Sequence, residues 1–379
     1  MRSRILSVFG TRPEAIKMSS VVRELAKYKD NFDSRVCVTA QHREMLDQAL
    51  DLFGISPNYD LDLMQRNQSL SDLTARILAG IQPILREFRP DCVLVHGDTT
   101  TTFAATLACF YEGVPVGHVE AGLRTGDLFA PWPEEANRRL TSVLTKYHFA
   151  PTQQARQNLL TEGVEDAAIA VTGNTVIDAL LSIVTKLQND PVLEASVAAR
   201  FPFLDGSKRL ILVTGHRRES FGSEFESFCQ SLRKIAVENE DVQIVYPVHL
   251  NPQVREPAHR ILSGVDRIFL LEPEEYLPFV YLMSRCDLII TDSGGIQEEA
   301  PSLGKPVLVT RDVTERPEAV AAGTVTLVGN SSILLLSEVN KILYGDRVGR
   351  PRREVSNPYG DGFASRRIVE ALKSGFGHA

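Results

Sequence analysis

The chain has 379 residues, of which 43% are apolar and 23% charged, and its formal net charge is −7. This length suits two or three domains with full cores, and the negative charge argues against nucleic acid or an anionic membrane as a partner. No apolar run is long enough for a membrane span or a signal-peptide core, and the five cysteines are scattered without a Cys-x-x-Cys pair. We therefore expect a globular, cytoplasmic protein with reduced cysteines.

Short β-branched runs alternate with amphipathic, helix-period stretches along the whole chain. The predicted strands are 5–9, 36–39, 92–96, 116–119, 148–150, 169–172, 210–214, 243–247, 268–271, 288–291, 307–310 and 325–328. The clearest helices are predicted at 13–28, 43–53, 176–186 and 364–373. Strand–helix–strand units with right-handed crossovers give parallel sheets that are covered on both faces.

Twelve strands are too many for one comfortable sheet of this kind, so we predict an α/β protein of two doubly wound, Rossmann-like domains. The chain should cross between them near residues 172–176, before the polar segment 185–207. Residues 1–173 then form the N-terminal domain and residues 174–362 the C-terminal domain. The last helix follows a turn-rich stretch, so residues 363–379 are expected to pack back on the N-terminal domain.

Polar and titratable residues follow most of the predicted strands. In open parallel sheets ligands bind beyond the carboxyl ends of the strands, so the active site is expected in the cleft between the two domains. The residues placed there by this rule are Arg12, Asp98, Glu120, His216, His249 and the turn 292–295.

The stretch that begins at Asp292 is the most informative of these. Ser293, Gly294 and Gly295 separate a buried strand from a short helix, and such a turn aims backbone N–H groups at a phosphate. Glu299, one turn further on, could accept hydrogen bonds from sugar hydroxyls. Phosphate and sugar together suggest a nucleotide. The alternative is a tight strand–helix turn without a ligand.

Three acids, Asp98, Glu120 and Glu134, are predicted to converge from the first domain. Each could instead be a structural cap for a loop. Arg12 and Lys17 offer positive groups for a diphosphate, although either could be a solvated surface charge.

From the other domain, Arg316 could bind the same diphosphate through two nitrogens. His216 faces the acids from that side.

A metal site is a rival interpretation, because His96-x-Asp98 and His118-x-Glu120 each put a histidine and an acid on one strand face. Against it, both histidines lie in apolar strands and there is no His-Glu-x-x-His motif. No Gly-x-Gly-x-x-Gly follows any strand, which argues against a dinucleotide. We therefore expect no metal and no cofactor.

At these residues the chain resembles the bacterial non-hydrolysing UDP-N-acetylglucosamine 2-epimerases, from end to end. The resemblance is carried by VFGTRPEAIK at 8–17, TAQHR at 39–43, HGDTT at 96–100, GHVEAGLRT at 117–125, WPEE at 132–135, TGHRRE at 214–219 and DSGGIQEEA at 292–300. Several distinctive blocks in the same order are much more specific than any one of them.

The resemblance implies the two-domain architecture of GT-B glycosyltransferases, a homodimer, and UDP held mainly by the C-terminal domain. The residues it assigns to UDP are Ser293, Gly294, Gly295, Glu299, Arg316 and His216, with Phe279 near the uracil and Arg12 and Lys17 reaching in from the other domain. Asp98, Glu120 and Glu134 would be the reacting carboxylates, with His216 beside them. Glu274 stands where a near relative has Gln beside the base.

The activity implied is reversible epimerisation of UDP-N-acetylglucosamine (UDP-GlcNAc) to UDP-N-acetylmannosamine (UDP-ManNAc), which supplies ManNAc for a bacterial cell-surface polysaccharide. UDP would be eliminated to leave 2-acetamidoglucal and then added back. The residue types do not settle which acid takes the C2 proton and which returns it. A hydrolysing epimerase, a GT-B glycosyltransferase and a non-catalytic sugar-nucleotide sensor stay open as alternatives.

The resemblance also implies an allosteric site for a second UDP-GlcNAc beside the active site. Its residues would be Gln41, His42, Arg66, Arg217 and His249. These positions add positive and hydrogen-bonding groups beyond those that one diphosphate needs. Alternatively, His42 and Arg43 cap the helix 43–53, and Arg217 only supports the loop of His216.

Overall fold

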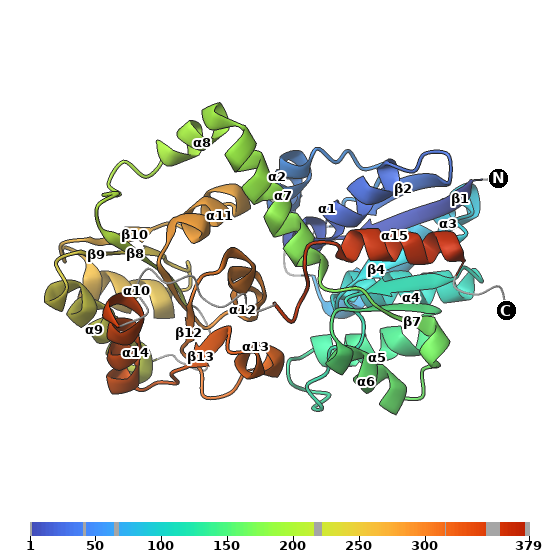
Figure 1. Cartoon of the computed structure of the whole chain (residues 1–379). Coiled ribbons are helices and arrows are strands. Elements are labelled where there is room, and N and C mark those ends of the chain that lie inside the picture. The colour runs from blue at the N-terminus through green and yellow to red at the C-terminus, as the bar shows by residue number, and fades with distance from the viewer. Residues whose placement is uncertain are drawn as a thin grey trace. The chain divides into compact units, whose positions relative to one another are not determined.

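The computed structural model describes residues 2–40, 43–63, 68–215, 222–314, 316–345 and 357–375. The chain divides into two compact units (Figure 1). Unit 1 comprises Met1–Ala179 and Tyr359–Ala379, and unit 2 comprises Leu180–Pro358. The division falls inside one helix, Thr175–Asn189, a few residues beyond the crossing that the sequence predicts. Within the described residues no helix is long and apolar enough to cross a membrane.

Unit 1 contains a seven-stranded sheet in the order β3-β2-β1-β4-β5-β6-β7, in which all neighbours are parallel. Its strands are β1 (Ser3–Phe9), β2 (Phe32–Val38), β3 (Tyr59–Asp60), β4 (Cys92–His96), β5 (Val116–Val119), β6 (Tyr147–Ala150) and β7 (Ile169–Val171). The strands are rich in Val, Ile and Leu and buried along most of their length, which is how a parallel strand covered on both faces reads in sequence.

The helices of unit 1 are α1 (Arg12–Ala26), α2 (Arg43–Phe53), α3 (Leu70–Phe88), α4 (Thr100–Tyr111), α5 (Glu134–Leu144), α6 (Gln153–Thr161), the first part of α7 (Thr175–Asn189) and α15 (Ala364–Ser374). On one side of the sheet, α3 and α4 pack together over a core that includes Leu6, Ile77 and Val93. The last helix, α15, lies against α1. Its first turn is anchored because the buried Asp178 accepts hydrogen bonds from the backbone N–H groups of Ala364 and Ser365.

Unit 2 contains a six-stranded parallel sheet in the order β10-β9-β8-β11-β12-β13. Its strands are β8 (Arg209–Thr214), β9 (Val242–Pro247), β10 (Ile268–Leu271), β11 (Leu288–Thr291), β12 (Val307–Val309) and β13 (Val325–Leu327). Its helices are α8 (Pro191–Ala198), α9 (Ser223–Glu238), α10 (Pro252–Leu262), α11 (Tyr276–Arg285), α12 (Gly294–Glu299), α13 (Pro317–Ala321) and α14 (Ser332–Tyr344), with a 3₁₀ turn after α12 (Ala300–Leu303).

All twelve predicted strands are present, and the prediction of two doubly wound parallel sheets is confirmed. Among the described residues, the strand β3, of two residues, was not predicted, and the polar segment 185–207 contains a helix, α8, that was not predicted either. The five cysteines are free and buried, as expected.

Candidate active site

In unit 1 the predicted site residues lie at the point where the strand order of the sheet reverses. β1 pairs with β2 on one side and with β4 on the other, so the connections after β1 and β4 leave in opposite directions and open a crevice at the carboxyl edge. Arg12 begins α1 directly after β1, and Asp98 follows β4. Glu120 follows β5, the next strand along. The two acids therefore lie at the ends of neighbouring strands.

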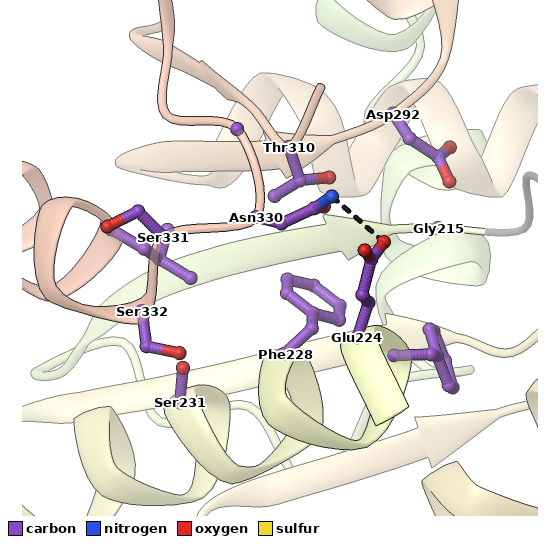
Figure 2. A pocket seen from close by; sticks show the side chains of 12 residues that line it. Gly215, Glu224, Phe228, Ser231, Asp292, Thr310, Asn330, Ser331 and Ser332 are labelled. Carbon is purple, nitrogen blue, oxygen red and sulfur yellow. Dashed lines mark hydrogen bonds between the residues drawn. The ribbon is translucent and has the colours of Figure 1, made fainter. Parts of the chain in front are cut away.

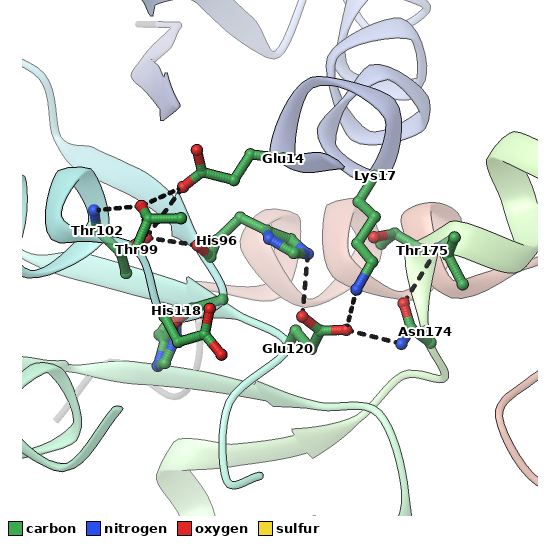
Figure 3. A network of polar contacts seen from close by, with 12 residues as sticks. Glu14, Lys17, His96, Thr99, Thr102, His118, Glu120, Asn174 and Thr175 are labelled. Atoms are coloured by element: carbon green, nitrogen blue, oxygen red, sulfur yellow. Dashed lines mark hydrogen bonds and ion pairs between the residues drawn. The ribbon is translucent and has the colours of Figure 1, made fainter. Parts of the chain in front are cut away.

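A buried acid, Glu14, joins the two loops at this point. Thr11 caps α1, and Oε2 of Glu14 accepts hydrogen bonds from the backbone N–H groups of Gly10 at 3.0 Å and Thr11 at 2.8 Å. Oε1 accepts one from the hydroxyl of Thr99, in the loop after β4, at 2.6 Å (Figure 3). Burial raises the pKa of Glu14 against these hydrogen bonds, which lower it. Glu14 was not among the predicted site residues, although Thr-x-x-Glu is a capping-box signature.

The carboxylate of Glu120 contacts polar side chains from several of the described elements (Figure 3). Its Oε1 lies 2.5 Å from Nζ of Lys17 and accepts a hydrogen bond from Nδ2 of Asn174 at 2.8 Å. Its Oε2 lies 3.6 Å from Nε2 of His96. The Glu120 backbone has φ +65°, a left-handed conformation that side chains rarely adopt. Such strained residues persist only where the surroundings hold them, and they cluster at functional sites.

Three buried histidines, His96, His118 and His148, lie on the neighbouring strands β4, β5 and β6. We refer to them as the histidine row. Burial lowers the pKa of His96 to about 4, of His118 to about 3 and of His148 to about 4. His118 Nε2 is 2.7 Å from the carbonyl oxygen of Gly97. Within the described residues no group of three or more His, Cys, Asp or Glu side chains is arranged to hold a metal ion.

The other two acids have different surroundings. Asp98 is bound by the guanidinium of Arg138, a residue of α5 that the sequence analysis did not select. Glu134 is the first residue of α5, and its Oε2 is covered by protein yet accepts no hydrogen bond from the described residues. Asp98 is therefore held by a cation, whereas Glu134 has a carboxylate oxygen without a hydrogen bond from the described residues.

In unit 2 the strand order reverses between β8 and β11. Gly215 follows β8, and Asp292 and Ser293 follow β11. A cavity of about 20 Å³ lies at this edge of the sheet, lined among others by Gly215, Asp292 and Thr310 (Figure 2). It has room for roughly one water molecule, so it is not itself a nucleotide pocket. His216 and Arg217 lie outside the described residues.

The predicted phosphate turn has the predicted local structure. Ser293 precedes α12, its backbone N–H donates to the hydroxyl of Thr291 at 2.9 Å, and its own side chain makes no capping bond to the helix. Gly294 is buried and Gly295 is exposed. Glu299 is buried at the end of α12, and Gly304, at φ +66°, ends the 3₁₀ turn that follows.

Arg316 lies beside this turn. Its Nε donates to Oε1 of the buried Glu298, which neighbours Glu299. The hydroxyl of Thr314 donates to Oε1 of Gln297 at 2.6 Å, so the segment before Arg316 is tied to α12 as well. Glu298 and Gln297 were not among the predicted site residues.

Three of the remaining predicted residues, Glu274, Phe279 and His249, lie further along the sheet of unit 2. Glu274 lies between β10 and α11 and accepts a hydrogen bond from Arg200 at 2.7 Å; burial raises its pKa, and Arg200 lowers it. Phe279 is half-buried on α11. His249 is exposed after β9, and its Nδ1 accepts a hydrogen bond from the backbone of Asn251. Gln41, His42 and Arg66 lie outside the described residues.

Two Rossmann-like units, each with its candidate residues at the switch point of a parallel sheet, define a GT-B-like α/β protein. The family model for UDP-N-acetylglucosamine 2-epimerase matches residues 23–373. The chain is 61% identical to the UDP-N-acetylglucosamine 2-epimerases of Yersinia pestis and of Escherichia coli K12, over 98% of this chain and 98% of each relative. The crystal structure of the Neisseria meningitidis UDP-GlcNAc 2-epimerase, bound to UDP-GlcNAc, is 53% identical with a TM-score of 0.89, and the match covers 98% of this chain and 100% of that one. The chain belongs to the UDP-N-acetylglucosamine 2-epimerase family.

Proposed function

We propose that this protein converts UDP-GlcNAc reversibly to UDP-ManNAc without net hydrolysis. The observation that carries the proposal is the set of acids in unit 1, in a chain that belongs to this family. Asp98 and Glu120 follow neighbouring strands, and Glu134 begins the helix that also holds Asp98. Inverting a carbon requires proton exchange on both faces of the sugar ring, and several carboxylates suit that chemistry.

In this proposal unit 2 holds the UDP moiety. The residues assigned to it are Ser293, Gly294, Gly295, Glu299, Arg316 and His216, with Phe279 and Glu274 toward the uracil. Backbone N–H groups at the Ser293 turn and the guanidinium of Arg316 are suitable donors for a diphosphate. Arg12 and Lys17 of unit 1 would add positive charge.

The proposed reaction is an anti elimination followed by re-addition. The bond from C1 to the diphosphate oxygen breaks, and its electron pair leaves with UDP. A carboxylate takes the proton from C2, and the C–H electron pair forms the C1–C2 double bond of 2-acetamidoglucal. UDP then adds back to C1 while a proton is delivered to the opposite face of C2. Carboxylates stabilise the positive charge that develops at C1, and the cationic residues stabilise the departing diphosphate.

Incubation with UDP-GlcNAc alone in deuterium oxide tests this proposal. We expect an equilibrium mixture with UDP-ManNAc, deuterium at C2 of the sugar, and activity that survives exhaustive chelation with EDTA. Accumulation of free ManNAc and UDP would show a hydrolysing epimerase. No reaction until a sugar acceptor is supplied would show a glycosyltransferase, and binding without turnover would show a sensor.

Two further parts of the proposal concern context. We infer that the protein is cytoplasmic and forms a homodimer; light scattering on the purified protein tests the oligomeric state, and fractionation of the cells tests the location. We also infer that its product supplies ManNAc for a cell-surface polysaccharide. Loss of ManNAc from surface polymers after deletion of the gene would support that role.

A further inference from the structure

Arg138 lies on α5, one turn after Glu134, and its guanidinium joins two carboxylates. Nε and Nη2 donate to the same oxygen of Asp98, Oδ2, at 3.0 and 2.6 Å. Nη1 donates to Oε2 of Glu135 at 3.0 Å. The exposed fractions of these side chains are 11% for Arg138, 27% for Asp98 and 0% for Glu135. A protected guanidinium therefore holds an acid that solvent and ligands can still reach.

The same helix also fixes the backbone of Asp98. Nδ2 of Asn137 donates to the carbonyl oxygen of Asp98 at 2.9 Å. Glu135 is held in turn, because its Oε2 also accepts a hydrogen bond from the backbone N–H of Thr125 at 3.2 Å. α5 thus fixes both the main chain and the carboxylate of Asp98.

The position of the donors decides which oxygen of Asp98 can carry a proton. A guanidinium has donors and no acceptor, so Oδ2 must accept both hydrogen bonds and cannot present a proton to Arg138. Within the described part of the chain no hydrogen bond reaches Oδ1 of Asp98. We propose that Arg138 is a positioning residue for the epimerisation: it holds the carboxylate so that Oδ1 is the oxygen that exchanges a proton with the substrate. This proposal rests on the proposed function, in which Asp98 is one of the reacting acids.

A double-mutant cycle tests whether Arg138 acts through Asp98. Arg138→Lys keeps the positive charge but loses the pair of hydrogen bonds that the guanidinium donates to Oδ2. We expect kcat to fall about 10- to 100-fold, as for a small misplacement of a reacting group, and KM to stay within about threefold of wild type. Asp98→Asn should lower kcat by about two to four orders of magnitude. The double variant should have the same kcat as Asp98→Asn alone, because the carboxylate that Arg138 is proposed to position is already absent.

Arg124 offers a matched control in the same unit. Its side chain is 7% exposed, and it binds both carboxylate oxygens of Glu162, at 2.8 and 2.7 Å. Within the described residues no hydrogen bond joins Arg124 to any of the three acids. Arg124→Lys therefore also weakens a protected guanidinium–carboxylate pair. We expect it to lower the melting temperature as Arg138→Lys does, and to leave kcat within about threefold of wild type, as for a change away from the reacting groups.

Rescue with a small molecule provides a second readout. Arg138→Ala leaves space beside Asp98, and millimolar guanidinium ion should restore part of its kcat, whereas it should not raise kcat of Arg124→Ala. A fall in kcat that adds to that of Asp98→Asn, or an equal fall in Arg124→Lys, would overturn the proposal. So would a failure of both Arg138 variants to fold when both Arg124 variants fold. An inactive wild type would instead overturn the proposed function itself.

Discussion

Substitutions in the ion pair between Lys17 and Glu120 should affect the stability of unit 1 and the enzymatic activity in different ways. Lys17→Met and Glu120→Gln each leave one charge without its partner, at a place where the side chains are only 17% and 8% exposed. Combining the two substitutions removes both charges. We expect the double variant to recover stability but not turnover, because in the proposed function the carboxylate of Glu120 takes part in the chemistry, whereas folding needs only the balance of the two charges.

The size of the effect follows from burial. Removing one partner of a fully buried ion pair costs about 3–5 kcal/mol of unfolding free energy. The side chain of Lys17 keeps some contact with solvent, so we expect about 2–3 kcal/mol for each single substitution and about 1 kcal/mol for the double variant. The coupling energy is then about 3–5 kcal/mol, which begins at the upper end of the range for residues in contact. For a unit of this size, the single substitutions should lower its melting temperature by roughly 5–10 °C. Glu120→Gln, alone or combined, should lower kcat by about two to four orders of magnitude.

Differential scanning calorimetry is the suitable assay, because two units can unfold in separate transitions and only the transition of unit 1 should move. Epimerisation of UDP-GlcNAc is measured on the same preparations. If the destabilisations of Lys17→Met and Glu120→Gln simply add in the double variant, the pair does not stabilise unit 1. If Glu120→Gln keeps full turnover, Glu120 is not a reacting acid.

Three further outcomes are expected. Asp98→Asn and Glu134→Gln should each lower kcat by about two to four orders of magnitude. The affinity for UDP, measured by calorimetry, should stay nearly unchanged, because UDP is proposed to be held by unit 2. A variant that loses UDP affinity but keeps normal turnover would show that the substituted residue contacts the ligand and is not a reacting acid. In the histidine row the folded-state pKa values lie below the ordinary 6.5, so between pH 6.5 and about 4 the unfolded chain binds protons that the folded chain does not, and stability is lost as the pH falls. A melting temperature of unit 1 that stays constant from pH 7 to pH 5 would contradict this. Finally, pure UDP-ManNAc should react slowly until a trace of UDP-GlcNAc is added, and His249→Ala should blunt that activation; a reverse reaction at full rate from the start would exclude the second site.

The sequence predicted the sheets well because their signal is local. A run such as 288–291 is apolar, β-branched and bounded by polar residues, and it becomes β11, buried on both faces. The missed strand β3 has only two residues and is defined by its pairing with β2, through Tyr59 beside Cys37 and Asp60 beside Val38. No local pattern marks such a strand. For α8 a local signal exists, since Asp190 caps the helix and Pro191 opens it.

For the candidate site, the acids could be predicted from the sequence, but their hydrogen-bond partners could not. The rule that ligands bind at the carboxyl ends of parallel strands selects Asp98 and Glu120 from their positions alone. The partners of those acids follow no such rule. Arg138 lies 40 residues from Asp98, and Asn174 lies 54 residues from Glu120. Which cation or amide meets which carboxylate depends on how α5 and the start of α7 pack on the sheet, and the sequence pattern of each helix specifies only its buried face.

The backbone of Glu120 adds a structural argument for its role. A non-glycine residue at φ +65° costs roughly 1–3 kcal/mol and persists only where its surroundings hold it. A glycine at this position would adopt the same turn without strain, but it would supply no carboxylate for Lys17 and Asn174 to bind. The next glycine, Gly122 at φ +86°, is needed for a different reason, because a Cβ there would come within 2.3 Å of the carbonyl oxygen of Ala155. In the turn after β5, glycine therefore occupies the position where a side chain would not fit, and a strained backbone occurs at the position that presents an acid. This supports the proposal that Glu120 is one of the reacting carboxylates.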